Sequence, residues 1–397
     1  MLERALLKPL LRSARRYPIV TVTGPRQSGK TTLVKAAFPR HAYANLEEPD
    51  QRTFAREDPR GFLSQYSDSV ILDEVQQVPT LLSYIQTLAD AKAKPGRFVL
   101  TGSQNLLLLQ SVSQSLAGRT AVLHLLPLSY SELKARKPLA LAAVGKRTAG
   151  RARVTRDSVF DILWSGLYPR IHDRKIPAHD WLANYYQTYV ERDVRTIINV
   201  GDLETFSRFV RLCAGRSGQL VNTVSLGNDC GVSHATVQRW LSMLEATFVI
   251  TLLRPYHNSF NKRLIKAPKL HFIDSGLLCY LLNVRSPREL QSHASRGAVF
   301  ESFVVSEFLK MHWHAGMPPQ LFFWRDSSDH EVDLIIERGA QPVAIEIKSA
   351  ATIASDFFSG LVYWRALKPS NRACGLIYTG QTSFARLGNF AYPWSTL

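Results

Sequence analysis

The feature that most restricts the fold of this chain is a glycine-rich segment directly after an apolar stretch. Residues 24–31 read Gly-Pro-Arg-Gln-Ser-Gly-Lys-Thr and fit the pattern G-x-x-x-x-G-K-[ST]. The apolar stretch Tyr17–Thr23 predicts a buried strand before it, and Lys30–Phe38 predicts a helix after it. With the strand, the lysine and the threonine all in place, the segment predicts a P-loop, and a plain glycine turn is the weaker interpretation.

Each part of this segment has a chemical role in holding a nucleotide. The glycines let successive backbone N–H groups face a phosphate at a helix N-terminus. We expect Lys30 to reach the β- and γ-phosphates and the Thr31 hydroxyl to bind Mg²⁺. The sequence therefore predicts ATP and Mg²⁺ as cofactors. The predicted nucleotide contacts in this segment are Gly24, Pro25, Arg26, Gln27, Ser28, Gly29, Lys30, Thr31 and Thr32.

Two carboxylates follow a second buried strand, Ser69–Asp73. A buried strand that ends in two acids is costly unless the acids have a task. We predict that Asp73 holds Mg²⁺ and that Glu74 orients or deprotonates the attacking water. A helix N-cap is the alternative role for this pair.

Three further residues complete the predicted phosphate site. Thr101 and Ser103 follow the strand Arg97–Thr101 and are candidates for contacting the γ-phosphate or the water; an N-cap is the alternative role for Ser103. Arg119, at the start of the strand Thr120–Leu125, is predicted to contact phosphate in its own subunit or in a neighbour, or else to form a structural salt bridge.

The order of these elements points to one class of P-loop protein. A further strand, His41–Leu46, lies in the sequence between the P-loop strand and the Asp73 strand, and Glu74 directly follows Asp73. This order is typical of AAA-type ATPases with an additional strand and a catalytic glutamate. The guanine-reading pattern N-K-x-D does not occur. We therefore expect a parallel α/β sheet at the N-terminus.

The middle of the chain predicts helices and then a winged helix. Val159–Phe209 reads as a helical region. In residues 225–244, the first helix should end near Asp229 and Cys230, Gly231 should make the turn, and Ser233 should cap a second helix, Ala235–Met243. Contact with DNA is one use of this fold, and packing inside the protein or against a neighbouring subunit is the other. Two strands, Phe248–Leu253 and Lys269–Ile273, should follow, with basic residues between them at Arg254, Lys262, Arg263 and Lys266.

The C-terminal part carries a second set of carboxylates on a predicted hairpin. Asp333 lies on the strand Glu331–Ile336, Gly339 turns the chain, and Val343–Lys348 is the partner strand. Glu346 and Lys348 share one face of that strand because side chains alternate. An acid followed by E-x-K on the next strand is the PD-(D/E)xK nuclease pattern.

In that pattern Asp333 and Glu346 bind Mg²⁺, and Lys348 positions or polarises the attacking water. Glu301 is the predicted further metal-binding acid, and Glu307 is its substitute. A surface hairpin with an ordinary Glu/Lys ladder is the alternative, but the apolar neighbours of these residues indicate a core sheet. The predicted order is a helix, the strand Leu321–Trp324, the two hairpin strands, the helix Ser355–Ala366 and the strand Cys374–Tyr378.

Charge and composition limit the setting of the protein. Of 397 residues, 49 are Lys or Arg and 32 are Asp or Glu, which gives a formal net charge of +17. Such a charge attracts polyanions, including nucleic acids. No apolar run is long enough to span a bilayer and no signal peptide is recognisable, so we expect a cytoplasmic protein without membrane contact. The four scattered cysteines predict buried free thiols.

The chain as a whole resembles a family of bacterial and archaeal AAA-type ATP-binding proteins whose C-terminal half is a domain of unknown function. The resemblance implies a P-loop ATPase, a winged helix and a PD-(D/E)xK-like C-terminal domain, and it suggests a homo-oligomer. The basic segment Lys134–Arg156 departs from the family pattern. The matching stretches are Gly24–Thr32, Leu72–Gln76, Leu100–Ser103, Leu116–Arg119, Pro127–Glu132, Gly166–Arg170, Tyr189–Val194, Lys269–Leu277, Phe300–Val304 and Glu331–Lys348.

These patterns predict four regions and one leading function. We expect an AAA-type ATPase domain at 1–133, a basic linker or exposed loop at 134–158, a helical winged-helix region at 159–290 and a nuclease-like α/β domain at 291–397. The leading function is an ATPase that acts on or binds DNA. A nucleotide-driven oligomeric switch or scaffold with an inactive nuclease-like domain is one alternative, and a DNA-binding regulator is another.

The net charge, the basic segment and the predicted wing generate a first testable prediction. DNA should bind mainly through its phosphates, so that log affinity falls steeply and linearly with log salt concentration. Fluorescence anisotropy of a labelled duplex over a salt series measures that slope. No binding at low salt, or an affinity that does not change with salt, would contradict the prediction.

Overall fold

The computed structural model describes the chain in nine stretches and separates it into two compact units. The described residues are 2–91, 94–103, 116–146, 157–194, 203–256, 267–339, 341–367, 372–386 and 389–397, with only the backbone described for 191–194. The N-terminal unit comprises Met1–Leu128, Ala246–Phe248 and Lys310–Pro318. The C-terminal unit comprises Ser129–Glu245, Val249–Leu309 and Pro319–Leu397.

The N-terminal unit is built on a parallel sheet of five strands, as the sequence predicts. Its strand order is β2-β3-β4-β1-β5, so β4 lies between the P-loop strand β1 and the Asp73 strand β3. β1 and β3 are buried throughout, because a parallel sheet with helices on both faces has no exposed side. The strands are β1 (Ile19–Thr23), β2 (Ala42–Asn45), β3 (Val70–Asp73), β4 (Phe98–Gly102) and β5 (Thr120–His124).

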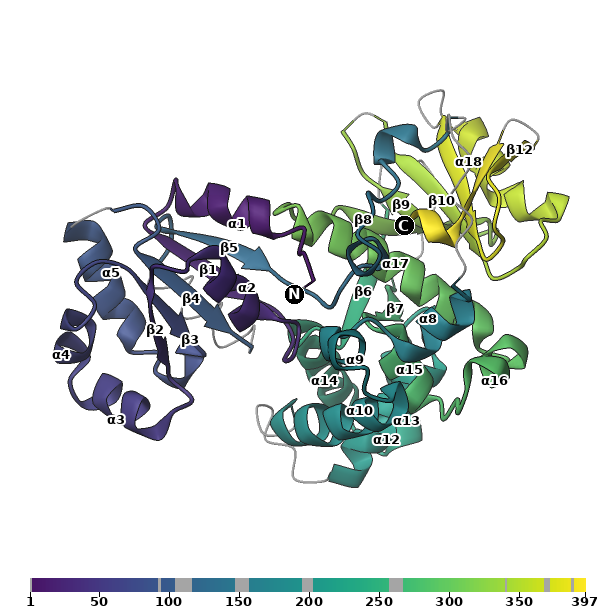
Figure 1. The fold of residues 1–397 in the computed structure, drawn as a ribbon. Coiled ribbons are helices and arrows are strands. Elements are labelled where there is room, and N and C mark those ends of the chain that lie inside the picture. Colours follow the sequence, from purple (N-terminus) through teal and green to yellow (C-terminus); the bar gives the residue numbers. More distant parts are fainter. Residues whose placement is uncertain are drawn as a thin grey trace. The chain divides into compact units, whose positions relative to one another are not determined.

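Helices cover the two faces of this sheet, and alternate strand residues decide which face each helix meets (Figure 1). Ile19 and Leu72 pack with residues of α4 and α5, whereas Val20 and Ile71 pack with residues of α1 and α2. Neighbouring residues of one strand therefore enter different cores. The helices are α1 (Leu7–Ala14), α2 (Lys30–Ala37), α3 (Pro49–Glu57), α4 (Pro59–Ser64) and α5 (Leu81–Ala91), with a 3₁₀ turn η1 (Val75–Gln77) after β3.

The C-terminal unit contains the predicted helix-turn-helix. α13 (Thr223–Cys230) ends at Gly231, whose φ of +72° is readily available only to glycine. Ser233 Oγ then accepts the backbone N–H of Thr236 at 3.2 Å and caps α14 (His234–Ala246). The helical elements of this unit that precede the motif in the chain are α7 (Tyr130–Leu133), α8 (Val159–Ser165), α9 (Pro169–Arg174), α10 (Ala178–Tyr185), a π-helical segment η3 (Tyr186–Val194) and α12 (Leu203–Gly215).

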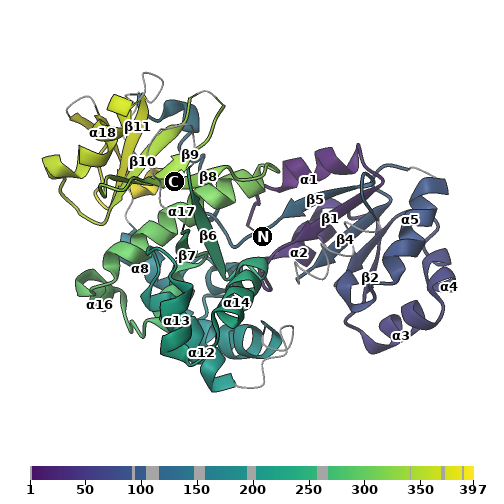
Figure 2. The same cartoon turned by 180° about the vertical axis from the view of Figure 1, so that it is seen from behind.

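The two strands after the helix-turn-helix belong to a larger sheet. The two predicted strands are β6 (Ile250–Pro255) and β7 (Lys269–Phe272), which pair antiparallel, but β6 also pairs in parallel with β8 (Leu321–Arg325). The hairpin therefore forms one end of an eight-stranded mixed sheet of order β12-β13-β11-β10-β9-β8-β6-β7 and is not a free wing (Figure 2). Of the predicted basic wing residues, Arg254 is exposed on β6, while Lys262, Arg263 and Lys266 lie outside the described residues.

The remaining elements follow the predicted C-terminal order and add two strands that the sequence did not reveal. β9 and β10 are antiparallel, and β10 runs parallel to β11. The unpredicted strands are β12 and β13, which pair with each other at the other end of the sheet. The elements are α15 (Ser275–Leu281), α16 (Pro287–Ser292), α17 (Arg296–His314), β9 (Glu331–Ile336), β10 (Val343–Lys348), η4 (Ser355–Phe358), α18 (Ser359–Leu367), β11 (Ala373–Tyr378), β12 (Phe384–Arg386), β13 (Asn389–Pro393) and η5 (Trp394–Thr396).

Part of the predicted basic linker is packed rather than exposed. Leu139 and Val144 are buried, and the backbone N–H of Leu139 donates to the carbonyl of Thr396 at 2.7 Å. The short turn η2 (Leu141–Ala143) and the residues after it hold Tyr392, whose hydroxyl donates to the carbonyls of Ala143 and Lys146. The expectation of an exposed loop is thus corrected for Leu139 and Val144, whereas Ala140, Ala142 and Lys146 are exposed and residues 147–156 lie outside the described part.

Two simple expectations from composition can be compared with the described residues. All four cysteines are buried and free, as predicted. None of the helices in the described stretches is both long enough and apolar enough to cross a bilayer.

Candidate functional site

The P-loop leaves the carboxyl end of β1 in a backbone path that requires glycine. Gly24 has a φ of +156°, and a Cβ there would lie 2.1 Å from the carbonyl oxygen of Leu125. Gly29 has a φ of +93° and immediately precedes the first residue of α2. The loop therefore closes around the helix N-terminus, where unpaired backbone N–H groups favour an anion.

Two buried cationic side chains, Lys30 and Arg4, donate hydrogen bonds to backbone carbonyls of this loop. Lys30 is buried, and its Nζ donates to the carbonyls of Gly24 at 3.0 Å and Pro25 at 2.9 Å. Burial lowers the pKa of Lys30. Arg4, which precedes α1, is also buried and donates to the carbonyl of Ser28 at 2.7 Å. Its other contacts are the carbonyls of Leu126 at 2.7 Å and Pro127 at 3.4 Å.

Asp73 is the point at which four elements meet. Its Oδ2 accepts hydrogen bonds from the hydroxyls of Thr31 at 2.7 Å and Tyr43 at 2.8 Å. Its Oδ1 accepts from the hydroxyl of Thr101. Burial and the hydrogen bond to Asp73 raise the pKa of Tyr43, which keeps its hydroxyl a donor. The structure thus brings together Thr31, Asp73 and Thr101, as predicted, and adds Tyr43.

Glu74, the residue after Asp73, has an unusual backbone conformation. Its φ of +53° and ψ of +46° are left-handed values that cost free energy in a residue with a side chain. Its Oε2 accepts from the Ser103 hydroxyl at 2.9 Å and from the Ser103 backbone N–H at 3.3 Å. Gln76 Nε2 also donates to this oxygen. Glu74 and Ser103, which are both predicted site residues, are therefore neighbours.

The residues present fit a magnesium-bound nucleotide. Ser28 Oγ in the loop and Thr23 Oγ1 at the end of β1 are buried and have no hydrogen-bond partner among the described residues. The Thr31 hydroxyl and the Asp73 carboxylate lie together and are the oxygen ligands that Mg²⁺ prefers. Among the other predicted nucleotide contacts, Arg26 Nη2 lies 3.7 Å from Glu47 Oε1. Pro25 is buried in the loop, whereas Gln27 and Thr32 are exposed.

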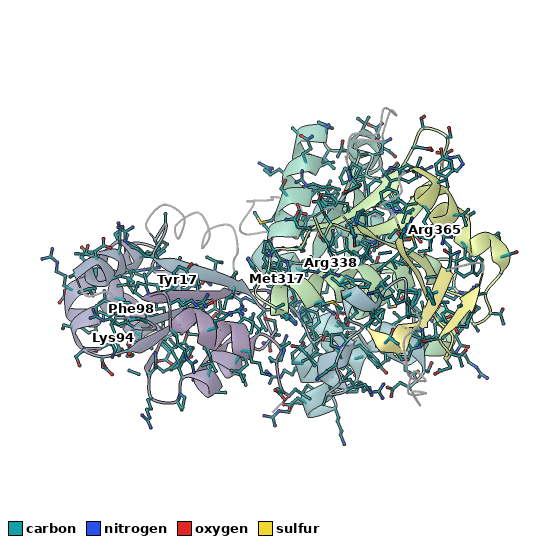
Figure 3. The ribbon with its side chains drawn as sticks, turned by 90° about the horizontal axis from the view of Figure 1, so that it is seen from above. Tyr17, Lys94, Phe98, Met317, Arg338 and Arg365 are labelled. Carbon is teal, nitrogen blue, oxygen red and sulfur yellow. The ribbon has the colours of Figure 1, made fainter. Side chains whose placement is uncertain are left out.

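Arg119 lies at the amino ends of the parallel strands, whereas the P-loop and Asp73 lie at their carboxyl ends. It precedes Thr120, which pairs with Ile19 at the start of β1, whereas the P-loop follows the end of β1. A five-residue strand spans about 13 Å, beyond the reach of one side chain in this direction. Its guanidinium instead holds Asp90 through Nε at 2.5 Å and Nη2 at 2.9 Å. Tyr17, Lys94 and Phe98 mark the same end of the sheet (Figure 3).

This geometry corrects one predicted role of Arg119. Contact with phosphate in its own subunit is wrong, and the structural salt bridge is confirmed. Contact with phosphate in a neighbouring subunit stays a prediction.

The C-terminal unit brings Asp333, Glu346 and Lys348 together on one face of its sheet. Lys348 Nζ lies 2.8 Å from Glu346 Oε2 and 3.4 Å from Asp333 Oδ2. The backbone N–H of Ile347 donates to Asp333 Oδ2 at 2.8 Å. The predicted grouping is thus present in the structure, and an exposed Glu/Lys ladder does not describe it, because both carboxylates are buried.

The two carboxylates have opposite pKa directions. Burial, and then the nearby Asp333, raise the pKa of Glu346 well above its usual value. Burial also opposes ionisation of Asp333, but Lys348, Lys269 and the Ile347 amide outweigh it and lower the pKa of Asp333. The two carboxyl groups interact closely enough that they titrate as a pair.

Glu301 and Glu307, the predicted further acids, are engaged by other residues. Lys269 Nζ lies 3.2 Å from Glu301 Oε1 and also contacts Glu331. Burial raises the pKa of Glu301 to about 7, although Lys269 opposes this shift. Glu307 accepts the backbone N–H of Tyr130 at 2.8 Å, which is a structural role. Within the described stretches no group of three or more His, Cys, Asp or Glu side chains is arranged to hold a metal ion.

A pocket of about 440 Å³ opens beside this cluster. Asp333, Lys348 and Glu301 line it together with His293, which precedes α17, and Arg296, which begins that helix. Asp333 and Glu301 therefore border this space together with basic side chains, whereas Glu346 does not line it.

Comparison with known proteins identifies the parts of the chain. A family model described as "AAA domain" matches residues 16–134. Models described as "Domain of unknown function (DUF8612)" and "Domain of unknown function (DUF4143)" match residues 156–288 and 296–397. The uncharacterized protein Rv2008c of Mycobacterium tuberculosis is 30% identical over 383 residues, covering 94% of this chain and 79% of that protein.

The uncharacterized protein Mb2031c of Mycobacterium bovis matches to the same extent, 30% identity over 94% of this chain and 79% of its own length. The chain belongs to the family of these mycobacterial proteins. Among solved structures, the Walker-type ATPase PABY2304 of Pyrococcus abyssi is 15% identical, with 71% of this chain and 96% of that chain covered and a TM-score of 0.46. A likeness at that score does not establish a shared fold.

The family assignment agrees with the geometry of the N-terminal unit. This unit contains an AAA-type P-loop domain, and its five-stranded sheet places Thr31, Asp73 and Glu74 at one edge. The site residues of the two domains of unknown function are not settled by the comparison and stay predictions.

Four residues of this family member take part in the sites but had not been predicted there. Arg4 lies far in sequence from its partners, so no local pattern marks it. Tyr43 and Gln76 lie in predicted elements or motifs, but neither residue type indicates a role by itself. Lys269 begins the stretch Lys269–Leu277, and alternation along β7 could have indicated that Lys269 and His271 share a face.

The contacts of Arg4 generate a prediction about nucleotide binding. Arg4→Met should loosen the P-loop and leave buried carbonyls unpaired, which costs about 1–3 kcal/mol. We expect the affinity for MgATP, measured by calorimetry, to fall about tenfold or more, which corresponds to about 1.4 kcal/mol.

Arg12→Met is the matched control, because Arg12 is exposed on α1 of the same unit. Equal MgATP affinity in the two variants would show that Arg4 does not support the loop.

Proposed function

We propose that this protein binds and hydrolyses ATP with Mg²⁺ at its P-loop. The observation that carries the proposal is the 2.7 Å contact between the Thr31 hydroxyl and Asp73, with Glu74 as the next residue. When bound, Mg²⁺ neutralises charge that develops on the β- and γ-phosphates. Lys30 would leave the loop carbonyls for the phosphates, and Glu74 would orient the attacking water and take its proton.

Substitution of Lys30 and Glu74 tests this proposal. Lys30→Ala should abolish MgATP binding or turnover, because it removes the cation at the loop. Glu74→Gln should keep ATP binding and lower turnover by about 10²–10⁴-fold, the usual worth of general-base catalysis. Phosphate release and calorimetry measure the two effects.

Lys8→Ala, an exposed lysine on α1, is the control and should behave as the wild type. Normal hydrolysis in both Lys30→Ala and Glu74→Gln would remove the basis for the assignment.

DNA is the proposed partner of the C-terminal unit. The second helix of the helix-turn-helix, α14, buries Val237, Trp240 and Leu241, and it exposes His234, Gln238 and Arg239 on another face. Exposed polar and basic side chains on this helix are the type that contact phosphates and base edges. The net charge of +17 supports the same partner. The AAA domain further supports a homo-oligomer, in which Arg119 could contact a neighbour's nucleotide.

A second proposed activity is metal-dependent cleavage of a phosphodiester at the Asp333 cluster. Two buried carboxylates in contact repel each other, and Mg²⁺ commonly binds through one or two carboxylates together with water or phosphate oxygens. The adjoining pocket supplies room for a substrate. A bound metal ion would polarise the phosphate, while Lys348, which contacts both acids, would position the attacking water.

Substitution within the cluster distinguishes this activity from ATP hydrolysis. Asp333→Ala and Lys348→Ala should each remove Mg²⁺- or Mn²⁺-dependent DNA nicking and leave ATP turnover intact, because the two sites lie in separate units. Asp329→Ala is the control, since Asp329 is exposed at the turn between β8 and β9.

Nicking that survives in Asp333→Ala would count against the cluster. If the wild type cuts no DNA with either metal, the alternative of a nucleotide-driven switch with an inactive nuclease-like domain is the better account.

A further inference from the structure

Gln76 is a buried polar side chain next to the proposed catalytic glutamate. It lies in η1, the 3₁₀ turn that follows β3, and its side chain enters the N-terminal unit with a residue exposure of 8%. Burying an amide is unfavourable unless it forms hydrogen bonds. Its contacts therefore indicate why this position carries a glutamine.

The Gln76 amide joins two residues that the ATP site needs. Its Nε2 donates to Glu74 Oε2 and lies 3.4 Å from Ser103 Oγ. Ser103 belongs to the end of the neighbouring strand β4 and donates to the same glutamate oxygen. Gln76 Oε1 is buried and has no hydrogen-bond partner among the described residues. The hydrogen bonds made by Nε2 are therefore the ones that orient the amide group.

These contacts constrain Glu74 in a particular way. All of its described side-chain hydrogen bonds reach Oε2, so Oε1 is the oxygen left for a water molecule. Hydrogen bonds to an ionised group are stronger than those between neutral groups, and several on one oxygen restrict the rotation of the carboxylate. The left-handed backbone of Glu74 shows that the surrounding structure also fixes its main chain.

We propose that Gln76 is a positioning residue for ATP hydrolysis. Its side-chain N–H holds the carboxylate of Glu74 so that Oε1 faces the water that attacks the γ-phosphate. The water loses its proton to Glu74 as its oxygen bonds to phosphorus, and the bond to ADP breaks. This inference rests on the proposed ATP hydrolysis and adds a residue to it. Gln76 acts through Glu74 and does not contact the nucleotide.

The test compares Gln76→Met with Gln77→Ala, in the wild type and in a Glu74→Gln background. Methionine keeps the volume of the buried side chain but removes its donor, whereas Gln77 is the adjacent, partly exposed glutamine. The measurements on the full chain are kcat, KM and the Kd for MgATP. Far-ultraviolet circular dichroism checks folding, and Gln76→Asn, which keeps an amide, replaces Gln76→Met if the latter does not fold.

We expect kcat to fall about 10–10²-fold in Gln76→Met, as a small misplacement of a catalytic group does, while KM and Kd stay unchanged. Gln77→Ala should match the wild type. In the Glu74→Gln background, Gln76→Met should cause no further loss, because the group that it positions is already absent.

Other results overturn the proposal. An unchanged or increased kcat in Gln76→Met, with turnover lost in Glu74→Gln, removes the role of Gln76 and leaves ATP hydrolysis at Glu74 in place. A further loss in the double variant equal to that in the single variant shows that Gln76 does not act through Glu74. Full turnover in Glu74→Gln itself contradicts the proposed function rather than the contact of Gln76 alone.

Discussion

The N-terminal unit depends on the hydrogen bonds that gather at Asp73. Thr31 from α2, Tyr43 from β2 and Thr101 from β4 all donate to this one carboxylate. A parallel sheet places the carboxyl ends of its strands at one edge, so residues far apart in the chain meet there. This edge brings the Thr31 hydroxyl, directly after the P-loop, beside the Asp73 carboxylate, and Glu74 is the next residue in the chain.

In the C-terminal unit, two lysines pair with a group of acidic side chains. Asp333, Glu346, Glu301 and Glu331 are acids in or beside a core sheet, where an unpaired charge is costly. Lys348 contacts the first two acids and Lys269 the last two. Lys269 comes from β7, next to the helix-turn-helix, and Glu301 comes from α17. The cluster is therefore shared between segments that match two different family models.

Much of this arrangement could be predicted from short-range patterns. The P-loop, the five parallel strands and the turn at Gly231 have local signals: a glycine motif, apolar runs and a capping serine. The meeting of Asp333 with Glu346 and Lys348 follows from strand alternation across a hairpin. In each case the residues that decide the structure lie within one or two elements.

The features that the sequence did not predict depend on long-range placement. Arg119 begins the correct strand, but only the parallel register shows that it lies at the edge away from the nucleotide site. Glu301 lies beside the cluster and pairs with Lys269 from β7, which no local pattern connects to it, and its role as a metal ligand stays a prediction. The packing of the segment around Ala143 and Gly145 depends on Tyr392, about 250 residues later in the chain, with which no local pattern connects it.

The most direct test of the account concerns the metal dependence of nucleotide binding. Calorimetry of ATP with and without Mg²⁺ should be run on the wild type, Asp73→Asn and Asp90→Asn, the last on α5, where Asp90 pairs with Arg119 away from the Thr31–Asp73 contact. We predict that the wild type and Asp90→Asn bind MgATP more tightly than metal-free ATP, and that Asp73→Asn loses this difference. Wild-type metal dependence in Asp73→Asn would contradict the claim that Thr31 and Asp73 form one magnesium-nucleotide site.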